Sequence, residues 1–334
     1  MFSKHYNKLD KSNWEGRIDS EDDFHSFRWH QWMEFIDLED ENLKPFEGKL
    51  GFAILGFCSD YGVKLNKGRT GTAHGPTSIR SELSSLPCAF TQDIKLFDAG
   101  NIACETCTLE EAQKSLGQAV SKILDLNLFP ILLGGGHEIA FGHYQGILNH
   151  LKKKEKSPKI GIINFDAHFD LRPYPNGGTS GTMFKQIADL NEDQDIDYSY
   201  LALGIQKHGN TMSLFNTAER LGAEHILAKE MNNGDNFALI EKVDAFIKDQ
   251  DHIYVTICSD VFSSAFAPGV SAPQPLGLDP EKVLVFLKHI LRSNKVVSFD
   301  IAEVSPRFDQ DNTTANLASV IIFSLVETLS KLMA

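Results

Sequence analysis

Short apolar runs that alternate with amphipathic stretches constrain the fold of this chain more than any other feature. Apolar residues at helical spacing occupy the stretches between the runs, for example at 109–126, 236–249 and 280–293, and a final helix is expected at 314–332. Strands separated by helices indicate a parallel sheet that is covered on both faces, so the predicted fold class is α/β. The runs that we interpret as strands are residues 49–57, 94–100, 128–136, 159–170, 198–206, 251–260 and 296–304.

The first part of the chain differs from this alternating pattern. Residues 1–48 are charged and aromatic, and they contain all three tryptophans, Trp14, Trp29 and Trp32. We interpret them as an N-terminal extension that packs on the main domain and expect a helix at about residues 26–36. Residues 49–334 are predicted to form a single catalytic domain, since a chain of 334 residues is long enough to bury a large core.

Charge and cysteine content narrow the classes of partner. The formal net charge of −13 disfavours nucleic acid and anionic membranes, which attract basic surfaces. We expect no targeting or membrane segment, because no run approaches about 18 uninterrupted apolar residues. Five scattered cysteines do not suggest a disulfide scaffold, so a cytoplasmic location is expected. Cys104 and Cys107 form a CxxC without a second such pair, and we expect no metal site there.

Ionisable residues follow three of the predicted strands. Asp166, His168 and Asp170 have alternating positions, and alternate residues of an extended segment point the same way, so the three side chains should converge. His137 and Asp260 follow two other strands, and ligands of parallel sheets bind beyond the carboxyl ends of the strands. Carboxylates and imidazoles suit a divalent ion such as Mn²⁺. Hydrogen-bonded side chains or helix caps are the alternative, but burying these groups without a cation would be unfavourable.

Four motifs in sequence order resemble the ureohydrolase superfamily, which includes arginase, agmatinase and formimidoylglutamase. They are GGGHE at 134–138, NFDAHFD at 164–170, SDVFSSAFAPGVSAP at 259–273 and SFDIAEVSP at 298–306. The resemblance covers about residues 50–330. It implies a three-layer α/β/α sandwich, arginase-like, around a mainly parallel, doubly wound sheet, and a site with two Mn²⁺ ions bridged by a hydroxide.

The resemblance also assigns ligands to the two ions. Asp166 would bridge them and so take part in catalysis, since a pair of cations lowers the pKa of a shared water. The resulting hydroxide would attack the trigonal carbon of a guanidino or formimino group. By motif match, one ion would be held by His137, Asp166 and Asp170, and the other by Asp166, His168 and Asp260.

Two further residues of these motifs matter for the chemistry. Glu303 matches the carboxylate that hydrogen-bonds the cationic amidine-type group, and a surface carboxylate at a strand end is the alternative. Cys258 departs from the family, because it stands where a bridging carboxylate is usual. A thiolate can bridge two metals but is sensitive to oxidation, and a neutral buried cysteine beside a weakened site is the alternative. Cys58 also ends a predicted strand, so we hypothesise that Cys58 and Cys258 form a redox pair.

The substrate is indicated by residues around the metal motif. Arg172 follows Asp170 by two positions and should lie at the mouth of the site, where an arginine fork binds a carboxylate. Ser180 stands where arginase and agmatinase carry a histidine, which resembles the formimidoylglutamase branch. N-formimidoyl-L-glutamate has two carboxylates, whereas agmatine has none. Arg69 and Asn210 are further substrate-binding candidates, although each such residue is often merely structural.

The resemblance therefore implies a binuclear manganese hydrolase that cleaves the C–N bond of N-formimidoyl-L-glutamate. The products would be L-glutamate and formamide, a step of histidine degradation, and the partner would be this small-molecule substrate. Two alternatives stay open: another ureohydrolase of the guanidinobutyrase, agmatinase or arginase type, and a catalytically silent relative that acts as a binding protein. The oligomeric state is also open, with a homo-oligomer compatible with the resemblance.

Overall fold

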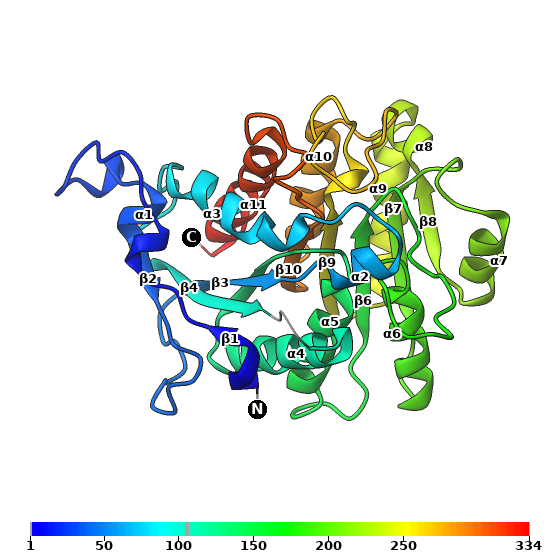
Figure 1. Cartoon of the computed structure of the whole chain (residues 1–334), viewed down its shortest axis with the longest axis horizontal. Helices are drawn as coiled ribbons and strands as arrows, with labels where there is room; N and C mark the ends of the chain where they lie inside the picture. Colours follow the sequence, from blue (N-terminus) through cyan, green and yellow to red (C-terminus); the bar gives the residue numbers. More distant parts are fainter. Residues whose placement is uncertain (1, 104–106, 334) are drawn as a thin grey trace.

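The computed structural model of the chain describes residues 2–103 and 107–333, so Cys104 of the CxxC pair lies outside the described residues. A ten-stranded sheet crosses this part of the chain in the order β1-β4-β3-β5-β10-β9-β6-β7-β8, and β2 also pairs with β4 (Figure 1). Every described pairing is parallel except that of β1 with β4. The strands are β1 (Tyr6–Asn7), β2 (Met33–Phe35), β3 (Leu50–Cys58), β4 (Ile94–Ala103), β5 (Phe129–Leu133), β6 (Ile160–Phe165), β7 (Ser199–Ile205), β8 (Glu224–Leu227), β9 (His252–Cys258) and β10 (Val296–Ala302).

Helices cover both faces of the sheet, which confirms the predicted three-layer α/β/α sandwich. The α-helices are α1 (Trp29–Trp32), α2 (Tyr61–Leu65), α3 (Gly75–Ser84), α4 (Leu109–Asp125), α5 (Ile139–Leu151), α6 (Met183–Asp193), α7 (Met212–Arg220), α8 (Ala228–Asn233), α9 (Asn236–Lys248), α10 (Pro280–Leu291) and α11 (Thr313–Leu332). Short 3₁₀ helices are Phe2–His5, Lys11–Asn13, Phe24–Ser26, Thr72–His74 and Ser259–Val261. Helices α3, α9, α10 and α11 pack on one face, and α4, α5, α6 and α7 pack on the other.

Local sequence explains where the main helices begin. Helix α4 follows Thr108, whose hydroxyl accepts a hydrogen bond from the backbone N–H of Glu111 at 3.2 Å, while the Glu111 carboxylate accepts one from Thr108 N at 3.0 Å. Helix α10 follows Asp279 and has Pro280 in its first turn, where the missing N–H of proline does no harm. These caps explain why α4 begins at Leu109 and α10 at Pro280.

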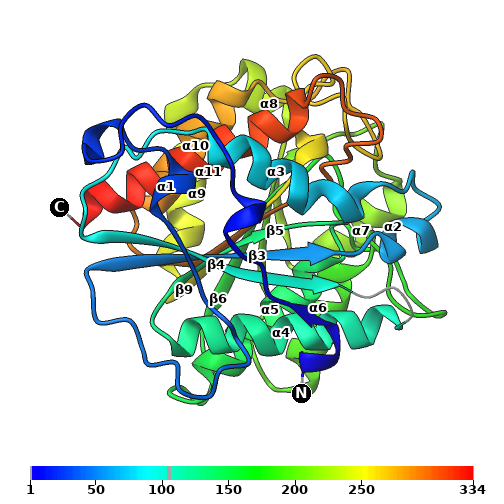
Figure 2. The same cartoon turned by 60° about the vertical axis from the view of Figure 1, so that its left-hand side comes forward.

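The N-terminal segment crosses the edge of the sheet, as Figure 2 shows in dark blue. Trp14 is buried and donates its indole N–H to Asp98 of β4 at 2.7 Å. Trp32 donates to the backbone oxygen of Ile94 at 2.9 Å. The structure thus attaches this segment to β4, and the domain boundary at residue 48 stays a prediction.

The helix predicted at about residues 26–36 is wrong. Only Trp29–Trp32 is α-helical, and Met33–Phe35 forms β2. Met33 lies opposite Leu96 in a parallel pairing with β4. The outer edge of β4 offers unpaired backbone groups, and pairing with them outweighs the local helical pattern.

Helix α11 is long and apolar enough to cross a membrane by length and composition alone. In the structure more than half of it is buried, and it packs against α3 and α10. Ile321, Ile322 and Leu325 belong to the core on that face of the sheet. A helix in the core of a folded domain has the same composition, so α11 is weak evidence for a membrane span.

Candidate metal centre

The ligands nominated from the sequence follow strands that are neighbours in the middle of the sheet. The order β5-β10-β9-β6 places four carboxyl ends side by side. His137 follows β5, Asp166 and Asp170 follow β6, Cys258 ends β9, and Glu303 follows β10. Residues far apart in sequence therefore meet at one edge of the sheet, as expected for a parallel α/β fold.

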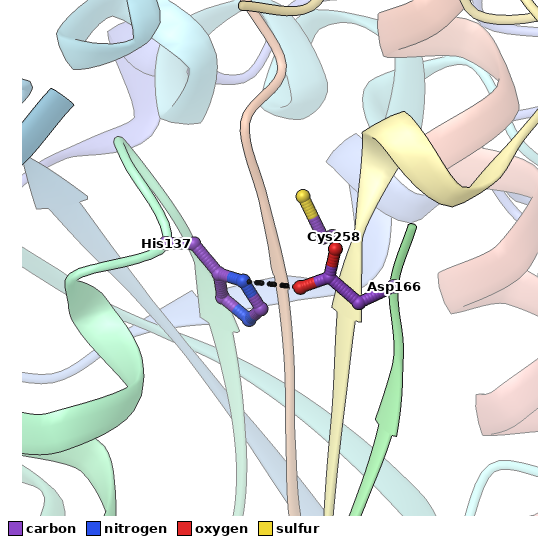
Figure 3. Close-up of side chains that lie close together, drawn as sticks. All are labelled: His137, Asp166 and Cys258. Atoms are coloured by element: carbon purple, nitrogen blue, oxygen red, sulfur yellow. Dashed lines mark ion pairs between the residues drawn. The ribbon is translucent and has the colours of Figure 1, made fainter. Parts of the chain in front are cut away.

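One cluster contains His137, Asp166 and Cys258, which Figure 3 shows together. All three are buried, and their potential ligand atoms lie within 4.8 Å of one another. Nδ1 of His137 lies 3.0 Å from Oδ2 of Asp166 and 3.2 Å from Oδ2 of Asp170. Asp170 thus adjoins this cluster, and Nδ1 of His137 lies close to two carboxylates.

A second cluster contains Asp166, His168 and Asp260, again with ligand atoms within 4.8 Å of one another. Nδ1 of His168 lies 3.2 Å from Oδ2 of Asp260 and 3.5 Å from Oδ1 of Asp166. Asp166 belongs to both clusters and presents a different oxygen to each histidine. The arrangement can hold two cations that share one carboxylate.

The electrostatics of the clusters favour positive charge. Burial by itself lowers the pKa of His137, but the close carboxylates of Asp166 and Asp170 raise that pKa well above its usual value. Burial also lowers the pKa of His168, and Asp260 and Asp166 raise it well above its usual value in the same way. Burial raises the pKa of Asp170 to about 6, with a further contribution from the neighbouring Asp166 carboxylate. In the metal-free protein, protons on the two imidazoles balance the negative charge of the carboxylates. A bound cation would replace these protons.

Several buried polar atoms in and beside these clusters lack a hydrogen-bond partner. They include Nδ1 of His137, Oδ1 of Asp260 and Oε2 of Glu303. Buried polar atoms are nearly always hydrogen-bonded, so unpartnered polar atoms beside several carboxylates suit a cation. Burial raises the pKa of the Cys258 thiol well above its usual value, and the surrounding carboxylates raise it further. A cation would oppose both effects and favour the thiolate.

The backbone is strained at two of the site residues. Asp170 has φ +50° and Glu303 has φ +69°, in the left-handed region that such residues rarely adopt. Strain of this kind persists where the surroundings impose it, and it concentrates at functional sites. The Glu303 carboxylate accepts a hydrogen bond from His137 N at 2.9 Å, and Glu303 N donates to the oxygen of Gly135 at 2.9 Å. These bonds join the loops that follow β5 and β10.

The triple glycine before His137 permits a close approach of chain segments. A Cβ at Gly135 would lie 1.8 Å from the backbone oxygen of Ser59, and one at Gly136 would lie 1.9 Å from Oε2 of Glu138. We would expect from the sequence that these glycines let the backbone approach the metals. The nearest atoms belong instead to the loop after β3 and to Glu138, so the glycines allow these loops to pack together.

A cavity of about 310 Å³ opens onto the clusters. Its lining contains all four substrate-binding candidates, Arg69, Arg172, Ser180 and Asn210. It also contains the metal candidates His137, His168, Asp170, Cys258 and Asp260, together with Glu303.

The four candidates differ in what their polar atoms contact. Arg172 is exposed, and its side chain makes no hydrogen bond or ion pair to residues 2–103 or 107–333, so its guanidinium is available to a ligand. Ser180 is buried at the cavity wall. Asn210 donates to the backbone oxygens of Ala167 at 2.8 Å and Gln206 at 2.9 Å, so its amide supports the Asp166–Asp170 loop.

Arg69 is also committed to the protein. It donates to the backbone oxygens of Ser271 at 3.0 Å and Val270 at 2.5 Å, and its guanidinium lies 4.1 Å from the centre of the Phe308 ring. These contacts hold two loops at the cavity rim. Arg69 therefore contributes positive charge near the cavity while it stabilises the rim.

Lys67 is a cavity residue that the sequence motifs did not indicate. This exposed lysine lines the cavity and has φ +62°, and it belongs to the same loop as Arg69. The only sequence signal is its place between Asn66 and Gly68 in a polar loop, which does not distinguish it from a solvated lysine.

The proposed redox pair of Cys58 and Cys258 is wrong. Strands β5 and β10 lie between β3 and β9. Three strand spacings separate the two cysteines by about 14 Å, far beyond the roughly 4.4–6.8 Å between the Cα atoms of a disulfide. Both are free thiols in the structure, and Cys58 does not belong to the cavity lining.

Comparisons with known proteins agree with these motifs. Residues 50–327 match the arginase family. A formimidoylglutamase of Clostridium tetani is 60% identical over 333 residues, which cover 99% of this chain and 98% of the relative. A formimidoylglutamase structure from Bacillus subtilis has a TM-score of 0.80 at 21% identity, covering 95% of this chain and 96% of that one. A Trypanosoma cruzi formiminoglutamase with Mn²⁺ has a TM-score of 0.75 at 23% identity, covering 86% and 97%.

Proposed function

The chain belongs to the arginase family of hydrolases, and we propose that it hydrolyses N-formimidoyl-L-glutamate to L-glutamate and formamide. The observation that carries the proposal is a pair of ligand clusters that share Asp166 beneath a cavity with a cationic rim. The similarity to the Clostridium tetani formimidoylglutamase over nearly the whole chain supports the same substrate. The reaction would be a step of histidine degradation.

Two Mn²⁺ ions per subunit belong to the proposal. His137, Asp166, Asp170 and Cys258 would hold one ion, and Asp166, His168 and Asp260 the other. When bound, the ions would lower the pKa of a shared water, so that hydroxide is available at neutral pH. Nδ1 of His137 and Oδ1 of Asp260 are buried without a hydrogen-bond partner, which supports the binding of metal ions at these atoms.

Glu303 would bind the reacting end of the substrate. Its Oε1 is held by the backbone N–H of His137, while Oε2 is buried without a partner in a residue that lines the cavity. Burial raises the pKa of Glu303 well above its usual value, so a cationic partner would be needed to keep the carboxylate charged. The protonated formimino group supplies such a partner and can donate a hydrogen bond to Oε2.

The cationic rim would bind the other end of the substrate. The unpaired guanidinium of Arg172 and the exposed Lys67 line the cavity, and Arg69 adds charge behind them. N-formimidoyl-L-glutamate carries a cationic formimino group and two carboxylates. An anionic floor with a cationic rim therefore matches the substrate in charge order and holds the formimino carbon over the clusters.

Ligation by Cys258 requires a reduced thiol. A thiolate is readily oxidised, and oxidation would remove a ligand from the first cluster. The proposal therefore includes a reducing compartment, the cytoplasm, and a reductant in every assay.

The direct test is to load the purified chain with Mn²⁺ under reductant and to measure the glutamate released from N-formimidoyl-L-glutamate. We expect release that is lost when the metal is removed by a chelator. Agmatine, guanidinobutyrate and arginine are the comparison substrates, and faster turnover of one of them would replace the proposed substrate. Absence of both metal binding and turnover would favour a catalytically silent binding protein.

A further inference from the structure

A chain of buried hydrogen bonds lies beneath the cavity and ends at His137. Nε2 of His137, on the side of the ring opposite to the metal candidates, lies 3.0 Å from the hydroxyl of Thr256. That hydroxyl donates to Oδ1 of Asp300 at 2.6 Å. Thr256 and Asp300 are register partners on β9 and β10, and all three residues are buried.

Asp300 is held firmly from the other side. Its Oδ2 accepts hydrogen bonds from the Tyr254 hydroxyl and from Nδ1 of His143, the latter at 2.5 Å. His143 belongs to α5, which begins just after His137, and its other ring nitrogen contacts the hydroxyl of Ser298. These side chains are fully buried, so no water competes for the Asp300 carboxylate.

The direction of the hydrogen bonds determines which nitrogen of His137 carries a hydrogen. A carboxylate only accepts, so the single hydrogen of the Thr256 hydroxyl is committed to Asp300. Toward His137 the hydroxyl can then only accept, and Nε2 must be the donor. In the neutral imidazole this leaves the lone pair on Nδ1, the atom that lies 3.0 Å from Asp166 and 3.2 Å from Asp170.

We propose that Asp300 and Thr256 are positioning residues that hold His137 in its metal-binding tautomer. The inference rests on the proposed function only in taking His137 as a metal ligand. Without Asp300, the Thr256 hydroxyl could donate to Nε2, and the hydrogen would move to Nδ1. An N–H there would bond to the carboxylates of Asp166 or Asp170 and compete with the cation for that site.

The test is a Mn²⁺ titration of the full-length chain under reductant, by equilibrium dialysis, at fixed pH. Thr256→Val keeps the size of the side chain and removes the hydroxyl, and we expect one of the two ions to bind about 10- to 100-fold more weakly. Thr256→Ser restores the hydroxyl and should restore the affinity. Thr328→Val is the matched control, because it removes a buried threonine hydroxyl that donates to the backbone oxygen of Ser324 within α11, the helix that packs on the other face of the sheet. The Thr328→Val variant should bind Mn²⁺ with the same affinity as the parent chain.

A second variant guards against misfolding of the first. Asp300→Asn keeps the shape but offers an amide in place of one carboxylate oxygen, and we expect the same selective loss of one ion. Unchanged Mn²⁺ affinity in folded Thr256→Val or Asp300→Asn would overturn this inference and leave the proposed function standing. Mn²⁺ binding to the parent without hydrolysis would overturn the proposed substrate alone. A parent chain that binds no Mn²⁺ would overturn both.

Discussion

Replacing Arg172 by alanine tests the proposed carboxylate contact with little risk to the fold. The side chain is exposed, and it makes no hydrogen bond or ion pair elsewhere in the described part of the chain. Its removal therefore leaves no buried partner behind. Arg69→Ala would be less informative, because Arg69 also holds the backbone oxygens of Val270 and Ser271 and packs on Phe308.

The size of the effect follows from the contact that Arg172 can make. A hydrogen bond between charged groups contributes roughly 1.5–3 kcal/mol, and a site at the cavity mouth is partly screened by water, which favours the lower end. About 1.5 kcal/mol corresponds to roughly a tenfold change in an equilibrium constant. Because the contact holds the substrate before and during reaction, we expect KM to rise about tenfold with kcat little changed.

The assay is steady-state hydrolysis of N-formimidoyl-L-glutamate by the Mn²⁺-loaded protein, with glutamate as the measured product. Arg292→Ala, an exposed arginine that does not belong to the cavity lining, is the matched control and should leave KM unchanged. Thermal unfolding and metal content should be the same in both variants. An unchanged KM in Arg172→Ala would refute the carboxylate contact, and a fall in kcat alone would assign Arg172 to the chemical step.

Three further predictions concern catalysis, stability and pH. Glu303→Gln should lower kcat by about 10²–10³-fold, because it removes a negative charge that stabilises the reacting group. Dialysis should show that Mn²⁺ is still bound, and a kcat equal to that of the parent would contradict the role of Glu303. Trp14→Phe should lower the free energy of unfolding by about 1 kcal/mol in urea titrations, because it removes the indole donor to a buried Asp98 oxygen that still accepts from Arg80; an unchanged midpoint would contradict this. Neighbouring carboxylates raise the pKa of His137 above its usual value despite burial, so a proton occupies the ring over a wider pH range in the metal-free protein. Mn²⁺ affinity should therefore still rise between about pH 7 and 8, where an unperturbed histidine is already mostly neutral, and a flat dialysis profile would refute that competition.

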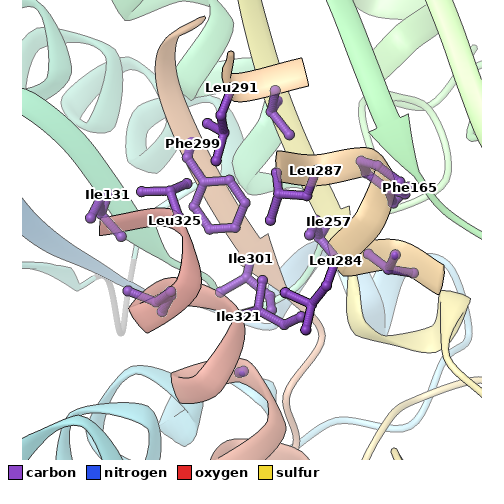
Figure 4. Packing of buried hydrophobic residues seen from close by; sticks show 14 of the residues in the cluster. Ile131, Phe165, Ile257, Leu284, Leu287, Leu291, Phe299, Ile301, Ile321 and Leu325 are labelled. Carbon is purple, nitrogen blue, oxygen red and sulfur yellow. The ribbon is translucent and has the colours of Figure 1, made fainter. Parts of the chain in front are cut away.

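The fold could largely be predicted from the sequence because its signals are local. The periodicity of apolar residues within a short segment indicates whether that segment forms a strand or a helix. The apolar residues of β10 and α11 are examples, because they form the buried core as this periodicity predicts. Figure 4 shows Phe299 and Ile301 of β10 packed among Leu287 of α10 and Ile321 and Leu325 of α11. The prediction failed at residues 33–35, where pairing with the edge of β4 overrides the local pattern.

The site was partly visible in the sequence for a similar reason. The spacing of Asp166, His168 and Asp170 already implied convergence, and the structure brings Asp166 and His168 into one ligand cluster and Asp170 beside the other. The role of Lys67 could not be seen, because a lysine in a polar loop has no spacing signal. The contact between Thr256 and Asp300 was equally hidden, since it depends on the pairing of β9 with β10.

The sequence by itself determined the alternation of strands and helices, the ligand types and their places at strand ends. These properties depend on residues that are close in sequence, so they do not depend on where the segment lies in the fold. Only the tertiary structure decided the strand order, which depends on long-range packing of the helices and strands. That order places Glu303 against His137 and Asp300 against Thr256, and it separates Cys58 from Cys258 by two intervening strands.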